Sequence, residues 1–199
     1  GSFTATNDGT NGTVTAASID ENLGGTVSSQ LATLGGSYTV NPCGRGTLTI
    51  ASRSYVFYVV SASGSVLLET TPGVIARGLL VQPQGGPFVN GSLSGSFALS
   101  LAGTNAAGAA GKRQDIVGQL KSGGTGTVTG GSLDINSFGV TQVGSAITGT
   151  YLPVPAGTLR GTALLSPTRN LVLYLVSPTQ FLVLGTDTTG TAIGSLYKQ

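Results

Sequence analysis

One stretch of this chain occurs twice, and that repetition constrains the fold more than any other feature of the sequence. The first occurrence reads Arg45-Gly46-Thr47-Leu48-Thr49-Ile50, followed by Tyr55-Val56-Phe57-Tyr58-Val59-Val60-Ser61. About 115 residues later the second reads Arg160-Gly161-Thr162-Ala163-Leu164-Leu165, followed by Leu171-Val172-Leu173-Tyr174-Leu175-Val176-Ser177. Self-similarity at such a period indicates a tandem duplication, so one structural unit is expected to occur twice.

The repeated stretches predict strands rather than helices. Runs of five to seven apolar and β-branched residues are separated by Gly, Pro, Ser and Asn, as in antiparallel strands joined by tight turns. No helical period stands out, and no run approaches the roughly 20 apolar residues of a membrane helix. We therefore expect an all-β protein of two tandem antiparallel β-barrel or sandwich-like units, each with about seven or eight strands.

The segment 82–87 is the best candidate for a linker between the two units. It contains two prolines and two glycines in six residues, which cannot lie inside a paired strand. We expect residues 1–84 to form the first β unit and residues 85–199 the second. Residues 88 to about 117 have no counterpart in the first copy, because Gly1 aligns near Gly118. The first copy is therefore expected to lack its opening strand.

A barrel that lacks one strand has two open edges, and something must cover them. The candidates are residues 97–101 crossing over from the second copy, a strand from a neighbouring chain, or further repeats of a longer array. We expect self-association through open strand edges near residues 1–6 and 93–101.

The composition excludes some classes of protein. Charged residues make up 8% of the chain, hydrophobic residues make up 39%, and the net charge is +2. Disorder goes with low hydrophobicity and high net charge, so the chain is expected to fold. Its basic residues are scattered, with Lys112 and Arg113 the only adjacent pair, whereas nucleic acid requires a patch or stripe of positive charge. We expect no nucleic-acid partner and no membrane span.

The absence of histidine removes most catalytic templates. It excludes Ser-His-Asp and Cys-His arrangements, imidazole metal ligands and a neutral-pH proton shuttle. A glycosidase would need two carboxylates facing each other across a cleft, yet only Asp20 and Asp134 recur convincingly in both copies. We expect no enzyme, with no catalytic, cofactor-binding or metal-binding residues and no cofactor. The single Cys43 excludes an intramolecular disulfide and leaves a free thiol or an intermolecular bridge.

Three recurring polar patterns have both a structural and a functional interpretation. The Asp-x-Asn pattern at Asp20 and Asp134 favours an Asx-type turn over a calcium site, because two ligands are too few for calcium. Arg45 and Arg160 begin a strand in each copy, where each is expected to partner a carboxylate or a carbonyl rather than capture a ligand. Tyr58 and Tyr174 lie in apolar runs and are expected to be core residues with a bonded hydroxyl.

Two further features concern the chain's setting. Asn11 and Asn90 match the glycosylation sequon, a short pattern that often occurs by chance. Few charges, no His, Met or Trp, and abundant Thr and Gly favour an exported protein. Because the sequence starts at Gly1 rather than Met, a secretion signal is expected to be cut off or outside it.

The pattern resembles the Gly/Thr-rich tandem β-repeat domains of secreted bacterial surface proteins. The resemblance covers nearly the whole chain and lies in the following motifs: Gly12-Thr13-Val14-Thr15, Ile19-Asp20-Glu21-Asn22, Gly36-Ser37-Tyr38, Arg45-Gly46-Thr47, Tyr58-Val59-Val60-Ser61 and Glu69-Thr70, echoed by Gly126-Thr127-Val128-Thr129, Leu133-Asp134-Ile135-Asn136, Gly149-Thr150-Tyr151, Arg160-Gly161-Thr162, Tyr174-Leu175-Val176-Ser177 and Gly185-Thr186. It implies a fold and a cell-surface setting but no catalytic residue. Gly185 replaces Glu69 in the second copy, which argues against an obligatory carboxylate there.

These observations favour a non-enzymatic extracellular structural protein, a β-rich subunit of a fibre, sheath or cell-surface stalk that assembles by strand exchange. The alternative is a lipocalin- or avidin-like barrel that binds a small apolar ligand. A binder needs a void of several hundred Å³, whereas a filled barrel needs large inward side chains such as Tyr58, Leu67, Leu173 and Tyr174 meeting at its axis.

Overall fold

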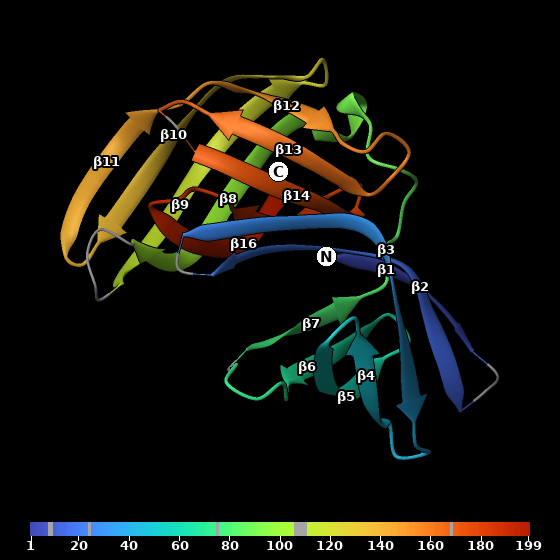
Figure 1. Ribbon diagram of the computed structural model, residues 1–199. Coiled ribbons are helices and arrows are strands. Elements are labelled where there is room, and N and C mark those ends of the chain that lie inside the picture. The colour runs from blue at the N-terminus through green and yellow to red at the C-terminus, as the bar shows by residue number, and fades with distance from the viewer. Residues whose placement is uncertain (8–9, 24, 75, 106–110, 168) are drawn as a thin grey trace. The chain divides into compact units, whose positions relative to one another are not determined.

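The computed structural model describes residues 1–7, 10–23, 25–74, 76–105, 111–167 and 169–199, and their regular structure is strand apart from one short 3-10 helix. The all-β prediction is therefore confirmed. The chain forms two compact units, of which the first comprises residues 1–19 and 29–83 and the second residues 20–28 and 84–199 (Figure 1). This division falls within one residue of the expected boundary, but the sequence does not predict that residues 20–28 belong to the second unit.

The first unit is a single sheet whose seven strands lie in chain order, with β1 and β7 at its two edges. The strands are β1 (Ser2–Asn7), β2 (Asn11–Leu23), β3 (Thr26–Val40), β4 (Arg45–Ile50), β5 (Arg53–Ser61), β6 (Gly64–Glu69) and β7 (Arg77–Val81).

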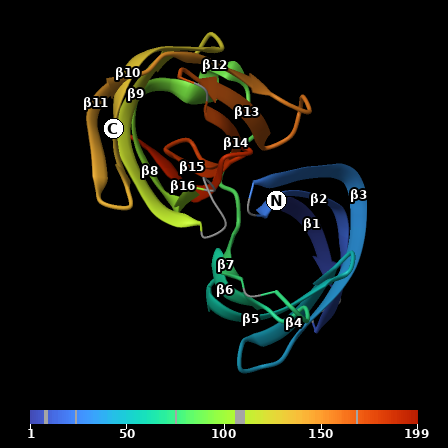
Figure 2. The same cartoon turned by 60° about the vertical axis from the view of Figure 1, so that its left-hand side comes forward.

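The second unit is a closed barrel with one additional strand. Its elements are η1 (Asn90–Leu93), β8 (Ser94–Asn105), β9 (Lys112–Gly123), β10 (Thr127–Ser137), β11 (Val140–Ala146), β12 (Gly149–Pro153), β13 (Arg160–Leu165), β14 (Arg169–Ser177), β15 (Gln180–Gly185) and β16 (Gly190–Lys198). β9 pairs with β8 on one side and with β10 on the other, which closes the ring seen in Figure 2. β11 lies outside the ring and is bordered by β10.

Corresponding residues of the two copies occupy corresponding positions in their sheets. Arg45 is paired with Tyr58 across β4 and β5, and Arg160 is paired with Tyr174 across β13 and β14. β8 has no counterpart in the first unit, where its place would lie between β7 and β1. The expectation of a duplicated β unit whose first copy lacks the opening strand is thus confirmed.

The predicted open edge at residues 93–101 is wrong. β8 is paired with β9 from Ser94 to Asn105 and with β16 from Phe97 to Asn105. Both of its hydrogen-bonding edges are therefore used inside its own barrel, and residues 97–101 do not cross over to the first unit. The other predicted edge, at residues 1–6, corresponds to β1 and lies at the margin of the first sheet.

Side chains fill the interior of the second barrel. Phe181 packs edge to face against Phe88 and Phe97, with ring centroids 5.4 and 6.1 Å away. Leu173 belongs to the same core, as do its alternate neighbours on β14. A cavity lined by these core residues has a volume of about 10 Å³. Gly161 is required beside this core, because a Cβ atom there would overlap the Phe88 ring.

The expectation that Tyr58 and Tyr174 meet at a barrel axis is wrong, because strand alternation turns both side chains outward. Leu173 and Phe57, their neighbours in the chain, occupy the two cores instead. Leu67 packs against the core of the first unit as expected, although it is only partly buried.

We expect Phe181→Ala to lower the free energy of unfolding by about 3–5 kcal/mol, because truncating a fully buried ring leaves a cavity. Phe138→Ala is the matched control. That ring is 68% exposed and lies 4.8 Å from the Lys112 ammonium, so its removal is expected to cost about 0.5 kcal/mol. Urea unfolding followed by circular dichroism measures both, and equal losses would contradict the assignment of the core.

Candidate functional site

Metal-ligating side chains do not gather in the described part of the chain. Among them, no group of three or more His, Cys, Asp or Glu side chains is placed to hold a metal ion. No helix in the described part of the chain combines the length and apolarity needed to cross a membrane. A buried polar cluster lies instead on the outer face of the second barrel, where residues 20–28 pack.

Asp20 and Arg160 form a buried ion pair in this cluster. Arg160 Nε donates to Asp20 Oδ2 at 2.7 Å, and Arg160 Nη2 donates to Asp20 Oδ1 at 2.9 Å. The Asp20 side chain is 0% exposed, and the Arg160 side chain is 6% exposed. Two parallel bonds from a planar guanidinium to a carboxylate are the strongest geometry for such a pair. The prediction that Arg160 partners a carboxylate is confirmed.

The remaining donors around Asp20 are also satisfied. Arg160 Nη1 donates to the Val154 carbonyl oxygen at 2.8 Å, and the Tyr174 hydroxyl donates to Asp20 Oδ2. Tyr174 is thus buried with a bonded hydroxyl, as expected, but on the outside of the barrel. The hydrogen bonds that Arg160 donates to Asp20 raise the pKa of Arg160 above its ordinary value although burial opposes this, so the guanidinium keeps its charge.

Asn22 fastens the same segment to the turn that follows β15. Its Nδ2 amide donates to the carbonyl oxygens of Gly185 at 2.9 Å, Asp187 at 3.1 Å and Gly190 at 2.7 Å. Its Oδ1 accepts from the Gly25 amide at 2.9 Å. Gly25 has φ +93°, and a Cβ atom there would overlap the Thr188 carbonyl, so the close approach of this turn requires glycine.

The Asp-x-Asn pattern forms the turn that the sequence predicts in both copies. Asn136 Oδ1 accepts from the Gly139 amide at 2.9 Å, just as Asn22 accepts from Gly25. Asp134 Oδ1 accepts from the Gly144 amide at 2.7 Å and is exposed. Asp20 differs from Asp134 because its carboxylate is buried against Arg160.

The first copy presents the same surface in an exposed form. Tyr58 is 52% exposed whereas Tyr174 is 7% exposed, and Val60 is 70% exposed whereas Val176 is 9% exposed. Arg45 is exposed, and its guanidinium makes no hydrogen bond or ion pair with the described residues. The predictions of a carboxylate or carbonyl partner for Arg45 and of a core position for Tyr58 are therefore wrong.

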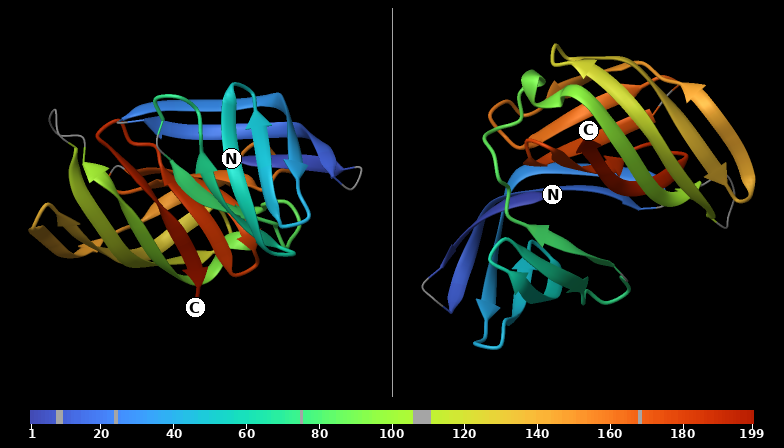
Figure 3. Two further views of the ribbon diagram at one scale, coloured as in Figure 1. Left: turned by 90° about the horizontal axis from the view of Figure 1, so that it is seen from below. Right: turned by 180° about the vertical axis from the view of Figure 1, so that it is seen from behind.

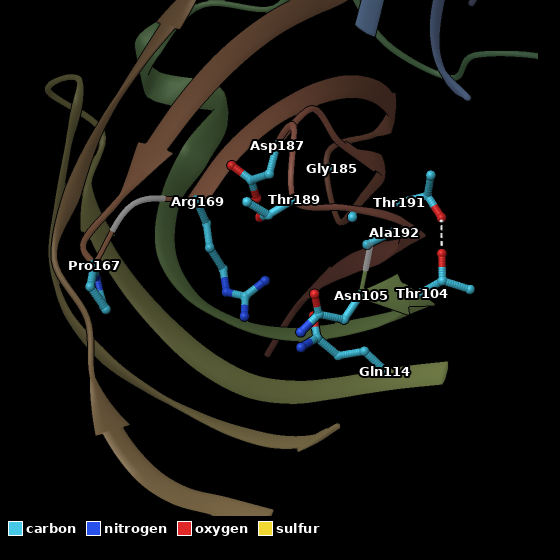
Figure 4. Close-up of a pocket in the computed structure, with 11 residues that line it drawn as sticks. Thr104, Asn105, Gln114, Pro167, Arg169, Gly185, Asp187, Thr189, Thr191 and Ala192 are labelled. Atoms are coloured by element: carbon cyan, nitrogen blue, oxygen red, sulfur yellow. Dashed lines mark hydrogen bonds between the residues drawn. The ribbon is translucent and has the colours of Figure 1, made fainter. Parts of the chain in front are cut away.

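Replacement of Glu69 by Gly185 changes a second charged position. In the first copy Arg53 Nη1 donates to Glu69 Oε1 at 2.7 Å. In the second copy Arg169 lines a polar pocket of about 220 Å³ together with Asp187 (Figure 4). Burial lowers the pKa of Arg169, and the nearby Asp187 carboxylate opposes this. One cation beside one anion matches no single class of ligand.

The other residues singled out in the sequence are not members of this cluster. Cys43 is exposed with a free thiol in the turn from Asn41 to Gly44, whose Gly44 amide donates to the Asn41 carbonyl at 2.9 Å. Asn11 begins β2 and Asn90 begins η1.

Sequence reasoning missed the pairing of Asp20 with Arg160. The two residues are 140 positions apart and belong to different copies, so no local spacing connects them. The available signal is that Asp-x-Asn and Arg-Gly-Thr recur together, one of each in every copy.

Comparisons with known proteins give no relationship for this chain: no protein-family model matches it, and a search of curated proteins finds no match.

We expect Asp20→Ala to destabilise the second unit by about 3–5 kcal/mol, because it leaves the Arg160 charge buried without its partner. Hydrogen exchange of residues 20–28 should become faster for the same reason, and urea unfolding measures the stability. Asp115→Ala is the control, since the Arg113–Asp115 pair is exposed and its loss should leave no measurable change. Unchanged exchange at residues 20–28 would show that the ion pair does not hold this segment.

Proposed function

We propose that this chain is a non-enzymatic, extracellular structural protein, a β-rich subunit of a fibre, sheath or cell-surface stalk that assembles by strand exchange between copies. The observation that carries the proposal is that β1 and β7 are edge strands, whereas the equivalent strands of the second unit are joined through β8. Unpaired strand edges are templates for pairing with another chain.

The second unit indicates which kind of strand fits between these edges. There, Ala98 of β8 is paired with Gln119 of β9 and with Tyr197 of β16 at the same time. Phe97 and Leu99 on either side of it face the core. A strand with this alternation would satisfy the backbone groups of β1 and β7 and add apolar side chains to the core of the first unit.

The edge at β1 has few of the features that protect natural sheet edges. Its sequence, Ser2-Phe3-Thr4-Ala5-Thr6-Asn7, contains neither a charged residue nor a proline. A register shift between Ser2 and Thr4 is its one irregularity in pairing with β2. On β7, Leu79 is an exposed large hydrophobic residue. Such edges favour association unless another strand covers them.

The remaining support is compositional. The absence of histidine and the scarcity of charged side chains leave little material for catalysis, and abundant Thr and Gly with few charges suit an exported module. The alternative, a barrel that binds a small apolar ligand, has less support, because the cavity of about 10 Å³ in the second barrel is far below the several hundred Å³ that such ligands occupy.

Strand exchange predicts that assembly is concentration dependent and that a free strand competes with it. We expect a synthetic peptide of residues 94–105 to bind the first unit in a 1:1 ratio and to reduce self-association, because it supplies the strand between β7 and β1. Sedimentation velocity measures the assembly, and fluorescence anisotropy of labelled peptide measures its binding.

The control peptide has Phe97, Leu99 and Leu101 replaced by serine, which keeps the backbone donors but removes the apolar face. It should bind much more weakly. A chain that stays monomeric at every concentration would overturn the proposal, and so would assembly that excess peptide leaves unchanged.

A further inference from the structure

We propose that the β10–β11 hairpin of one chain docks on the outer face of β4 and β5 of a second copy, through Asp134, Arg45 and Tyr58. This inference rests on the proposed function, since both require self-association, but it concerns a different surface from the open edges of β1 and β7. It supplies the contact that would join chains head to tail.

The chain already makes this contact once, within its second unit. There the hairpin segment 20–28 places Asp20 against Arg160 and Tyr174, which form a cross-strand pair on the outer face of β13 and β14. Asn22 adds hydrogen bonds to the turn after β15. Among the described residues, no strand pairing joins this segment to the barrel strands. The contact is therefore made by side chains on one face of the hairpin.

The β10–β11 hairpin has the same contact residues at the same spacing as the segment 20–28. Asp134, Asn136 and Gly139 correspond to Asp20, Asn22 and Gly25, and the Gly139 amide donates to Asn136 Oδ1 at the same 2.9 Å. Figure 3 shows β11 as an outermost strand, and it is bordered by β10. Phe138 and Val140 are exposed at the hairpin's turn.

The pairing of β9 with β10 does not cover the face of the hairpin that bears Asp134 and Asn136. β9 is paired with β10, and Val117 lies opposite Asp134. This pairing occupies the edge of β10 and not its face, so Asp134 and Asn136 remain exposed. Ile135, between them, points to the other side and packs against the barrel core.

The acceptor surface in the first copy repeats that of the second copy in its backbone bonds. Arg45 and Tyr58 are paired across β4 and β5 as Arg160 and Tyr174 are across β13 and β14. The turn after β6 is held by the Thr70 amide donating to the Ser54 carbonyl at 2.7 Å. The matching bond after β15, from the Thr186 amide to the Asn170 carbonyl, measures 2.8 Å.

Charge and exposure identify a second copy as the occupant. The guanidinium of Arg45 is exposed and positively charged. The exposed carboxylate of Asp134 has the opposite charge and would bind Arg45 as Asp20 binds Arg160. Tyr58 and Val60 beside Arg45 are exposed where Tyr174 and Val176 are buried. One hairpin and one acceptor surface per chain form a heterologous contact, which produces an open filament unless the rotation closes a ring.

The test is a charge exchange in the full chain. Arg45→Asp alone and Asp134→Arg alone should each raise the dissociation constant for self-association about thirtyfold or more, because each leaves like charges facing each other at the contact. The chain with both substitutions should return to within about threefold of the unsubstituted protein, because the charges are again opposite. Sedimentation velocity measures all four proteins, and circular dichroism checks that each is folded.

Mixing the two single variants tests the head-to-tail geometry. Between the two variants both possible contacts join opposite charges, whereas within either variant alone like charges meet, so an equimolar mixture should recover the assembly that neither variant shows by itself. A dye on Cys43, the chain's single cysteine and exposed two residues before Arg45, should report this assembly by a rise in anisotropy. The control Lys121→Asp makes the same change of charge at an exposed position on β9 and should assemble like the unsubstituted chain.

The outcomes separate this inference from the proposed function. Single variants that assemble like the unsubstituted chain, while the strand peptide still blocks assembly, would overturn the hairpin contact and leave strand exchange standing. Variants that lose assembly without recovery in the doubly substituted chain would also overturn it. A strictly monomeric unsubstituted chain would overturn both proposals.

Discussion

The need of every strand edge for a hydrogen-bond partner governs this structure. In the second copy β8 satisfies it, because one strand pairs with β9 along one edge and with β16 along the other. The barrel closes, and the aromatic and aliphatic side chains of β8 complete a filled interior. In the first copy the same sheet ends at β1 and β7. Two corresponding copies thus differ in closure because of a single strand.

The second difference between the copies is the environment of the Arg-Gly-Thr strand. Arg160 and Tyr174 are buried because the segment 20–28 brings Asp20 to them, and the low exposure of this group makes the ion pair depend on complete hydrogen bonding. Arg45 and Tyr58 hold the same positions in their own sheet without such a cover. Assembly through strands and assembly through the hairpin are therefore separate consequences of one duplication.

Much of this architecture could be predicted from the local pattern of the chain. The alternation of apolar residues, the Gly and Pro punctuation and the recurrence of Arg-Gly-Thr predict strands, turns and two copies, because each depends on neighbouring residues. The position of Tyr58 could not be predicted in this way. An apolar run predicts that one face of a strand lies in the core, but it does not show which face. That choice depends on the pairing register, and a shift of one residue would turn Tyr58 instead of Phe57 into the core.

The sequence by itself determined that this protein is all-β, that it is duplicated and that its first copy has no counterpart of residues 88 to about 117, because hydrophobic period and repetition are local properties. Tertiary structure alone decided that residues 20–28 belong to the second unit and that Asp20 meets Arg160, 140 positions away. The physical reason is that a buried ion pair needs a surface which excludes water, and distant strands create that surface only after they have paired.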